Sequence, residues 1–120
     1  MNIETLLNKI RLGEDSKLEL KRLVMRSNTK VEAPHPDGLA DELAAMANAQ
    51  GGMLVLGIDD KSKQVLGIPY EDLDVVESWL AELCQDRITP PLDVITEHIE
   101  LPDTSGQQRP VIVVTIPKSL

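Results

Sequence analysis

Residues 39–60 constrain the fold of this chain more than any other segment. They begin with an alanine-rich helix pattern in which four residues share one apolar stripe: Leu39, Leu43, Met46 and Ala47. Gly51 and Gly52 follow, and one of them supplies the left-handed residue that ends such a helix. An apolar run comes next and stops at two adjacent carboxylates, Asp59 and Asp60. The segment therefore predicts a helix, a tight glycine turn and a buried strand with an acidic exit.

The rest of the chain alternates helix and strand signals around this unit. The elements predicted by spacing are a short helix over Ile3–Ile10 ended by Gly13, a strand over 16–21, a helix over 39–49 with Asp37 as N-cap, strands over 53–58 and 65–68, a helix over 71–87, and strands over 93–101 and 111–116. Residues 26–38 are polar and contain Pro34 and Pro36, which predicts an extended excursion or a mobile loop. The order predicts an α/β (α+β) fold: a mixed, largely antiparallel sheet packed by two or three helices.

Length and composition suggest one domain over residues 1–120 with an aliphatic core, because there is no Phe and there are only two aromatic residues. The chain stops directly after a predicted strand, so we expect it to be the N-terminal part of a longer protein, with C-terminal domains as partners. The single cysteine, Cys84, fits a reducing compartment. No apolar run approaches the ~20 residues that span a bilayer, so we expect a cytoplasmic protein without a membrane partner.

Charge is distributed unevenly along the chain. Residues 1–30 hold seven Lys and Arg against four Asp and Glu, a net charge of +3. The remainder carries −11, which brings the total to −8. A polyanion would be attracted to the first quarter, and the candidate nucleic-acid-binding residues are Lys17, Lys21, Arg22, Arg26 and Lys30. The alternative is that these are solvated surface charges. Scarce aromatics argue against holding single strands by base stacking.

Four carboxylates are the candidate catalytic residues: Glu14, Glu19, Asp59 and Asp60. Three of them, Glu14, Glu19 and Asp59, are the candidate metal ligands, since carboxylates at strand ends suit Mg²⁺ or Mn²⁺. Such a metal activates water and stabilises charge on a phosphodiester, and Lys21 would contact the phosphate. The alternative is structural: Asp59-Asp60 forms a hairpin turn, and Glu19 pairs with Lys21 or a cross-strand partner.

Other sites have little support in the sequence. Gly51-Gly52 follows a helix rather than opening one, and neither phosphate-loop pattern is present. The two histidines, His35 and His98, and the lone Cys84 do not form a zinc motif. No G-x-S-x-G pattern indicates a serine hydrolase.

Several motifs together resemble the Schlafen AlbA-like domain. In order they are Glu14 followed by Leu18-Glu19-Leu20-Lys21, the helix end Ala45-Met46-Ala47-Asn48-Ala49-Gln50-Gly51-Gly52, the strand Leu54-Val55-Leu56-Gly57-Ile58-Asp59-Asp60, and Val65-Leu66-Gly67-Ile68. Ile88-Thr89-Pro90-Pro91 and the closing VIVVTIPKS are also similar. The chain departs from the family pattern at Leu20, where Phe is usual, and at Ala49-Gln50.

The resemblance implies an α/β DNA-binding module of prokaryotic transcriptional regulators. It also implies an alternative, because animal Schlafen cores cleave RNA with two glutamates and an aspartate; these correspond to Glu14, Glu19 and either Asp59 or Asp60, with Lys21 matching the family lysine. A third alternative is a protein-interaction or nucleotide-sensing module. A homodimer is an expectation here, since residues 111–116 would leave an apolar edge strand that needs cover.

Overall fold

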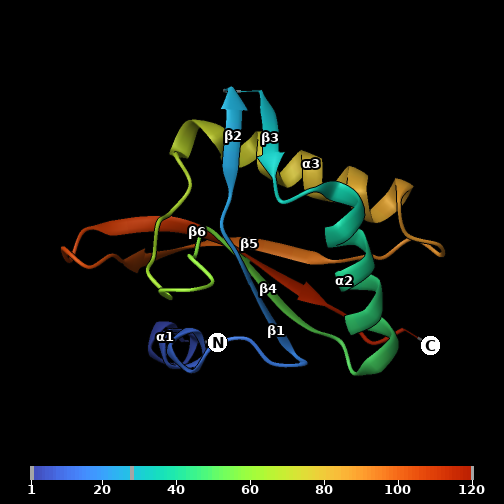
Figure 1. Cartoon of the computed structure of the whole chain (residues 1–120), viewed down its shortest axis with the longest axis horizontal. Helices are drawn as coiled ribbons and strands as arrows, with labels where there is room; N and C mark the ends of the chain where they lie inside the picture. Colours follow the sequence, from blue (N-terminus) through green and yellow to red (C-terminus); the bar gives the residue numbers. More distant parts are fainter. Residues whose placement is uncertain (1, 28, 120) are drawn as a thin grey trace.

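The computed structural model describes residues 2–27 and 29–119. Its elements, in chain order, are α1 (Ile3–Leu12), β1 (Leu18–Lys21), β2 (Val24–Ser27), β3 (Lys30–Ala33), α2 (Pro36–Ala49), β4 (Gly52–Leu56), a 3₁₀ turn η1 (Tyr70–Asp72), α3 (Leu73–Asp86), β5 (Ile95–Pro102) and β6 (Gln108–Ile116). The predicted α+β class is confirmed, with three helices and a mixed, largely antiparallel sheet (Figure 1).

The main sheet has four strands in the order β1-β4-β6-β5. β1 runs parallel to β4, with Glu19 beside Leu54, and the other two pairings are antiparallel. The prediction that 111–116 forms an edge strand is wrong, because β6 lies between β4 and β5 and both of its sides are paired. The edges of this sheet are β1 and β5.

Helices cover both faces of the sheet. One apolar cluster joins α2 and α3 to one face through the alternate β4 residues Leu54 and Leu56. The other cluster joins α1 to the opposite face through Val55. Period-2 alternation thus buries every residue of this stretch of β4, which is why the run Leu54-Val55-Leu56 is continuously apolar.

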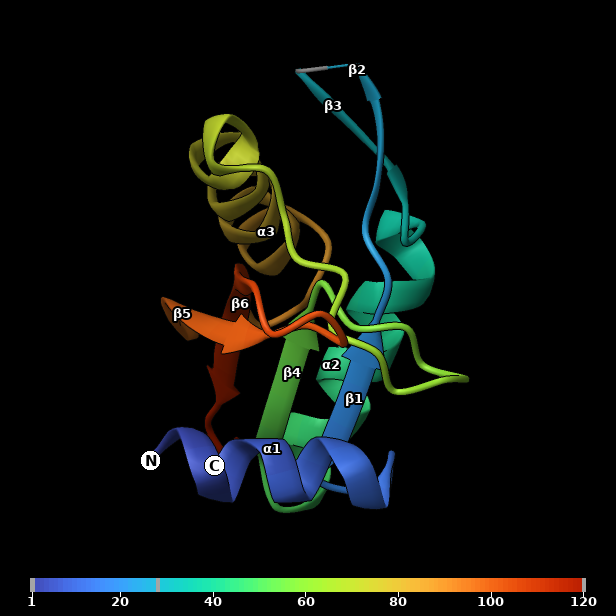
Figure 2. The same cartoon turned by 90° about the vertical axis from the view of Figure 1, so that its left-hand side faces the viewer.

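Of the two alternatives predicted for residues 26–38, an extended excursion or a mobile loop, the structure shows the first. It contains a second, two-stranded sheet, β2–β3, that extends away from the main sheet (Figure 2). Residue 28 lies outside the described residues. Local polarity concealed the hairpin, because its strands are short and its ladder is irregular, with register shifts on both sides of Met25.

Helix and strand boundaries differ from expectation in two places. α2 begins at Pro36 with His35 as N-cap, so Asp37 lies in the first turn rather than at the cap. Residues 65–68 form no strand; only a single bridge joins Ile58 to Val65. The predicted glycine turn is confirmed, with Gly51 at φ 78°.

Candidate functional site

Two of the predicted site residues, Glu14 and Glu19, meet at the β1 edge of the sheet. β1 alternates as expected: Leu18 and Leu20 are buried on the α1 side, and the intervening Glu19 and Lys21 are half-buried. Glu19 and Lys21 therefore project from the opposite face, the one covered by α2. That helix contributes a further carboxylate, Glu42, from the turn next to its buried stripe.

These side chains form a connected cluster, called here the carboxylate cluster: Glu14, Glu19, Glu42 and Lys21. The carboxyl group of Glu19 lies within hydrogen-bonding reach of both Glu14 and Glu42. Lys21 Nζ lies 2.9 Å from Glu42 Oε1 and 3.9 Å from Glu19 Oε2. The backbone N–H of Leu20 donates to Glu14 Oε2 at 3.2 Å, which fixes Glu14 against the strand.

The pKa values of Glu14 and Glu19 move in opposite directions within the cluster. Partial burial, hydrogen bonds to Glu14 and Glu42 and their negative charges raise the pKa of Glu19 to about 8. Burial alone would also raise the pKa of Glu14, but its bonds with Glu19 and Leu20 and the charge of Lys21 lower it overall. At neutral pH, Glu19 is therefore the protonated member and donates to the Glu14 carboxylate.

The structural alternative predicted for Asp59, a place in a turn, is seen in the structure. Asp59 Oδ1 accepts the backbone N–H groups of Lys61 at 2.9 Å and Ser62 at 3.3 Å, so the side chain closes the turn that follows β4. Those two bonds lower the pKa of Asp59. Asp60 is exposed in the same turn, and its carbonyl accepts from Lys63 Nζ.

The structure brings together two of the three predicted metal ligands. Glu14 and Glu19 lie together, while the Asp59 carboxylate is occupied by its own turn. Over residues 2–27 and 29–119, no three of the His, Cys, Asp and Glu side chains are grouped so that they could hold a metal ion. Cys84 is buried in the core and His98 is exposed on β5.

The five predicted nucleic-acid-binding residues are spread over several parts of the surface. Lys17 precedes β1, and Lys21 is engaged with Glu42. Arg22 follows β1 and is close enough to Asp59 for its charge to help lower that pKa. Arg26 on β2 and Lys30 on β3 are exposed on the projecting hairpin.

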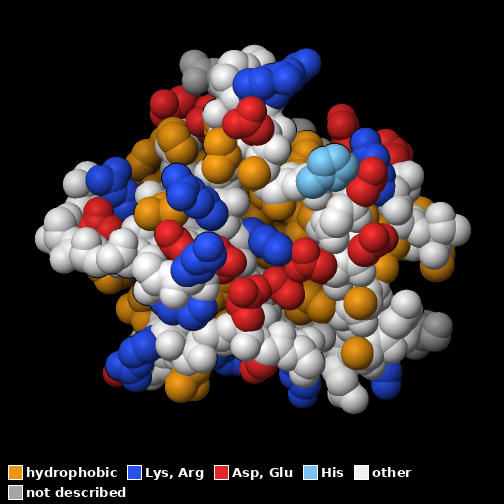
Figure 3. Space-filling view, viewed as in Figure 1, with side chains coloured by type: hydrophobic (Ala, Val, Ile, Leu, Met, Phe, Trp, Pro, Cys, Tyr) orange, Lys and Arg blue, Asp and Glu red, His pale blue; other side chains and the backbone are white. Residues whose placement is uncertain are grey.

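Arg22 belongs to a larger group of cations that we call the basic rim: Arg11, Arg22, Lys61 and Lys63. The positive charge of Lys61, like that of Arg22, helps to lower the pKa of Asp59. Lys63 extends over Gly13, and a Cβ added at that glycine would lie 3.1 Å from Lys63 Cε. Arg11 and Lys63 also line one groove of about 370 Å³ between α1, the 62–65 segment and the β5–β6 turn. Figure 3 shows Lys and Arg side chains spread over this side of the molecule, with acidic side chains gathered near the centre of the view.

Sequence reasoning missed Glu42, Lys61 and Lys63. Glu42 follows the pattern of an ordinary solvated helix position, and only the packing of α2 beside β1 brings it to Glu19. The two lysines sit in a turn directly after Asp59-Asp60, and a turn rich in charge was the only local signal. None of the helices in the described part of the chain is long and apolar enough to cross a membrane.

The fold and site define a class: an α+β domain built on one mixed sheet, with a cluster of carboxylates and a lysine at a parallel edge strand. The family model described as Schlafen, AlbA_2 matches residues 14–120. The chain belongs to the Schlafen AlbA_2 family, as the motifs predicted, and this family points to a nucleic-acid-related domain.

Proposed function

We propose that this chain is a nucleic-acid-binding domain of a transcriptional regulator. One observation carries the proposal beyond family membership: the basic rim draws Arg11, Arg22, Lys61 and Lys63 from three separate segments onto one side of the molecule. Cations that are distant in sequence and adjacent in space form a surface that attracts phosphate, even on a chain of net charge −8.

The residues of the rim indicate how binding would work. Lys and Arg contact the phosphate backbone, whereas stacking requires aromatic platforms, and the whole chain has one Trp and one Tyr. The projecting hairpin adds two exposed cations, Arg26 and Lys30. We therefore expect binding that depends on backbone charge and prefers a duplex to a flexible single strand.

Fluorescence anisotropy tests the proposal directly. The probes are a labelled duplex of about 20 base pairs, the matching single strand and an RNA hairpin, each titrated with protein between roughly 25 and 200 mM NaCl. We expect the association constant to fall steeply with salt, since each phosphate contact contributes roughly 0.9 to the slope of log K against log salt.

The double variant Arg22→Glu/Lys63→Glu examines the basic rim. We expect it to weaken binding at least about tenfold and to reduce the salt slope by about 2. Lys118→Glu is the matched control, because Lys118 is exposed beside Gly51, at the other end of β4 from the Asp59 turn. The proposal fails if no probe binds at the lowest salt, or if the control weakens binding as much as the double variant.

A second function, metal-dependent cleavage of RNA, is favoured by the pair Glu14–Glu19, whose carboxyl groups lie within hydrogen-bonding reach, with Lys21 beside it. The test is incubation of a structured RNA with the protein in Mg²⁺ or Mn²⁺, with Glu14→Gln and Glu19→Gln compared against wild type. We expect both variants to lose cleavage while retaining the thermal transition. Absence of cleavage by the wild type, or equal cleavage by all three proteins, rejects this second function.

A further inference from the structure

β5 is the outer strand of the main sheet and has a long, regular free edge. It pairs with β6 over eight consecutive residues, Ile95–Pro102, without a register shift. Its first four residues and Glu100 are exposed. Natural edge strands are usually shortened, bulged, or protected by proline or by charged side chains, above all lysine. β5 is neither short nor bulged and has no lysine; its charged side chains include Glu97 and Glu100, and it ends at Pro102.

The register identifies which backbone groups face outward. In the β5–β6 turn, Asp103 N–H donates to the carbonyl of Gln107, so this pair is hydrogen-bonded. Antiparallel pairs alternate between bonded and non-bonded, and therefore the even-numbered residues of β5 turn their N–H and C=O away from β6. Pro110 agrees with this assignment, because it stands opposite Glu100 and its carbonyl accepts from Ile68 on the other side.

Three residues thus carry the outward groups: Thr96, His98 and Glu100. No backbone hydrogen bond outside the regular ladders involves these residues in the described chain, nor does any side chain there bond to their backbone. Pro102 is the next even position and has no N–H, so the donor row ends at Glu100.

We propose that β5 binds β5 of a second copy of this chain, antiparallel, about a two-fold axis at His98. Under that axis Thr96 faces Glu100 of the second copy, and His98 faces its counterpart. All three outward residues then exchange both backbone groups, giving about six hydrogen bonds and one continuous sheet that joins the two main sheets.

The side chains favour the same register. Opposite pairs would be Ile95 with Leu101 and Glu97 with Ile99, so neither Glu97 nor Glu100 faces a carboxylate directly. Ile95, which is 69% exposed in the single chain, would lie opposite Leu101, which is already buried in the core of its own copy. A shift that centres the axis on Glu97 places two glutamates face to face and leaves fewer backbone bonds.

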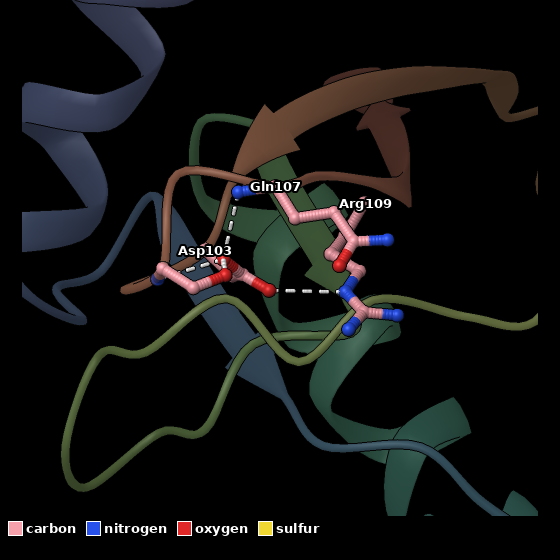
Figure 4. Close-up of polar contacts among 4 residues, drawn as sticks. Asp103, Gln107 and Arg109 are labelled. Carbon is pink, nitrogen blue, oxygen red and sulfur yellow. Dashed lines mark hydrogen bonds and ion pairs between the residues drawn. The ribbon is translucent and has the colours of Figure 1, made fainter.

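The β5–β6 hairpin is held rigid for this contact by its turn (Figure 4). Asp103 Oδ1 accepts from Ser105 N at 2.8 Å and Gln107 N at 3.0 Å, while Oδ2 accepts from Arg109 Nε at 3.0 Å. A preorganised edge loses less conformational entropy on association than a flexible strand does.

Register-specific cross-linking tests the proposal. His98→Cys places the two cysteines in a directly opposed pair, whose Cα atoms are about 5.5 Å apart in antiparallel sheets and within disulfide reach. We expect mild oxidation to convert most of this variant into a covalent dimer. Thr96→Cys and Glu100→Cys, each alone, should stay monomeric, whereas their equimolar mixture should cross-link. Wild type is the control for Cys84, which is buried.

Light scattering provides an independent measurement without substitution. A contact limited to one strand pair buries little surface, so we expect a dissociation constant on the order of 10–100 μM. Above that concentration the measured mass should approach twice the 13.2 kDa of one chain. Each copy carries a charge of −8, so added salt should strengthen the dimer. Salt weakens nucleic-acid binding, and the two proposals therefore fail or succeed separately. A monomer at concentrations well above this range in high salt, or equal cross-linking by all three single cysteine variants, overturns the proposal.

Discussion

Replacing Glu19 by glutamine should remove most of the pH dependence of stability between about pH 5 and 8. In the folded protein, burial and the carboxyl groups of Glu14 and Glu42 raise the pKa of Glu19 to about 8, from a usual 4.5. A raised pKa favours the fold while the group is protonated. The contribution is therefore fully present below pH 4.5 and is lost as the pH rises through 8.

The magnitude follows from the geometry. The full displacement of the pKa corresponds to about 5 kcal/mol if no solvent reaches the group. The Glu19 side chain remains 23% exposed, and the lowered pKa of Glu14 changes stability only below about pH 4.5, outside this range. Solvent screening at such an exposed cluster reduces the expected loss for the wild type to about 1–2 kcal/mol over this pH range.

Trp79 provides the assay, because it is the only tryptophan and lies half-buried on α3. Urea unfolding followed by its fluorescence gives the free energy of unfolding at each pH. Glutamine keeps the shape of protonated Glu19 and can donate to Glu14, so Glu19→Gln should match the wild type within about 0.5 kcal/mol at about pH 5. At about pH 8 the variant should be more stable by about 1–2 kcal/mol.

A matched control separates this effect from the effect of removing any one surface carboxylate. Glu32 is an exposed carboxylate on β3, and Glu32→Gln should retain the wild-type pH dependence. If Glu19→Gln and wild type show parallel stability curves across this range, the proposed sharing of a proton within the carboxylate cluster is wrong.

Three further predictions concern stability. Gly51→Ala should lower the free energy of urea unfolding by at least about 2 kcal/mol, because φ is 78° and the new Cβ would lie 2.6 Å from the Ile116 carbonyl oxygen. Gly38→Ala is the contrasting variant: Gly38 has open space around it in the first turn of α2, so this change should stabilise the protein by about 0.5 kcal/mol. Hydrogen bonds from Ser105 and Arg109 lower the pKa of Asp103 to about 2, so its contribution is present above pH 3.8 and is lost as the pH falls through 2. Asp103→Asn should flatten the acid limb of a pH titration monitored by circular dichroism, and an unchanged limb would contradict this. Leu43→Ala, at a fully buried site between α2 and the sheet, should cost about 2–5 kcal/mol by the same urea assay, whereas a loss under about 1 kcal/mol would refute its core role.

Sequence patterns predicted the structure correctly where the hydrophobic period of a strand or helix could be read within one short segment. Alternation over Leu18–Lys21 placed two leucines in the core and Glu19 and Lys21 together on the other face. The helix stripe at Leu39, Leu43, Met46 and Ala47 is buried as expected. These predictions hold because side-chain direction repeats every 2 residues in a strand and every 3.6 in a helix.

The β2–β3 hairpin and the β6 strand show where such patterns fail. The hairpin strands are four residues each and half-exposed, so they lack the apolar alternation that marks a strand. β6 is apolar, but apolarity does not distinguish an edge from a central position. Its central place depends on pairing with β4, which is distant in the sequence, as well as with β5 across a short turn.

The sequence by itself determined the α+β class, a glycine turn at Gly51-Gly52, the faces of β1 and membership of a family with the Glu14–Glu19 motif. Only the tertiary structure decided that Glu42 joins Glu19, that Asp59 is occupied by its own turn, and that β5 carries the free edge. The physical reason is range: periodicity fixes which way a side chain points along its own element. Strand order and helix docking, set by the burial of the whole core, decide which side chains from different elements meet.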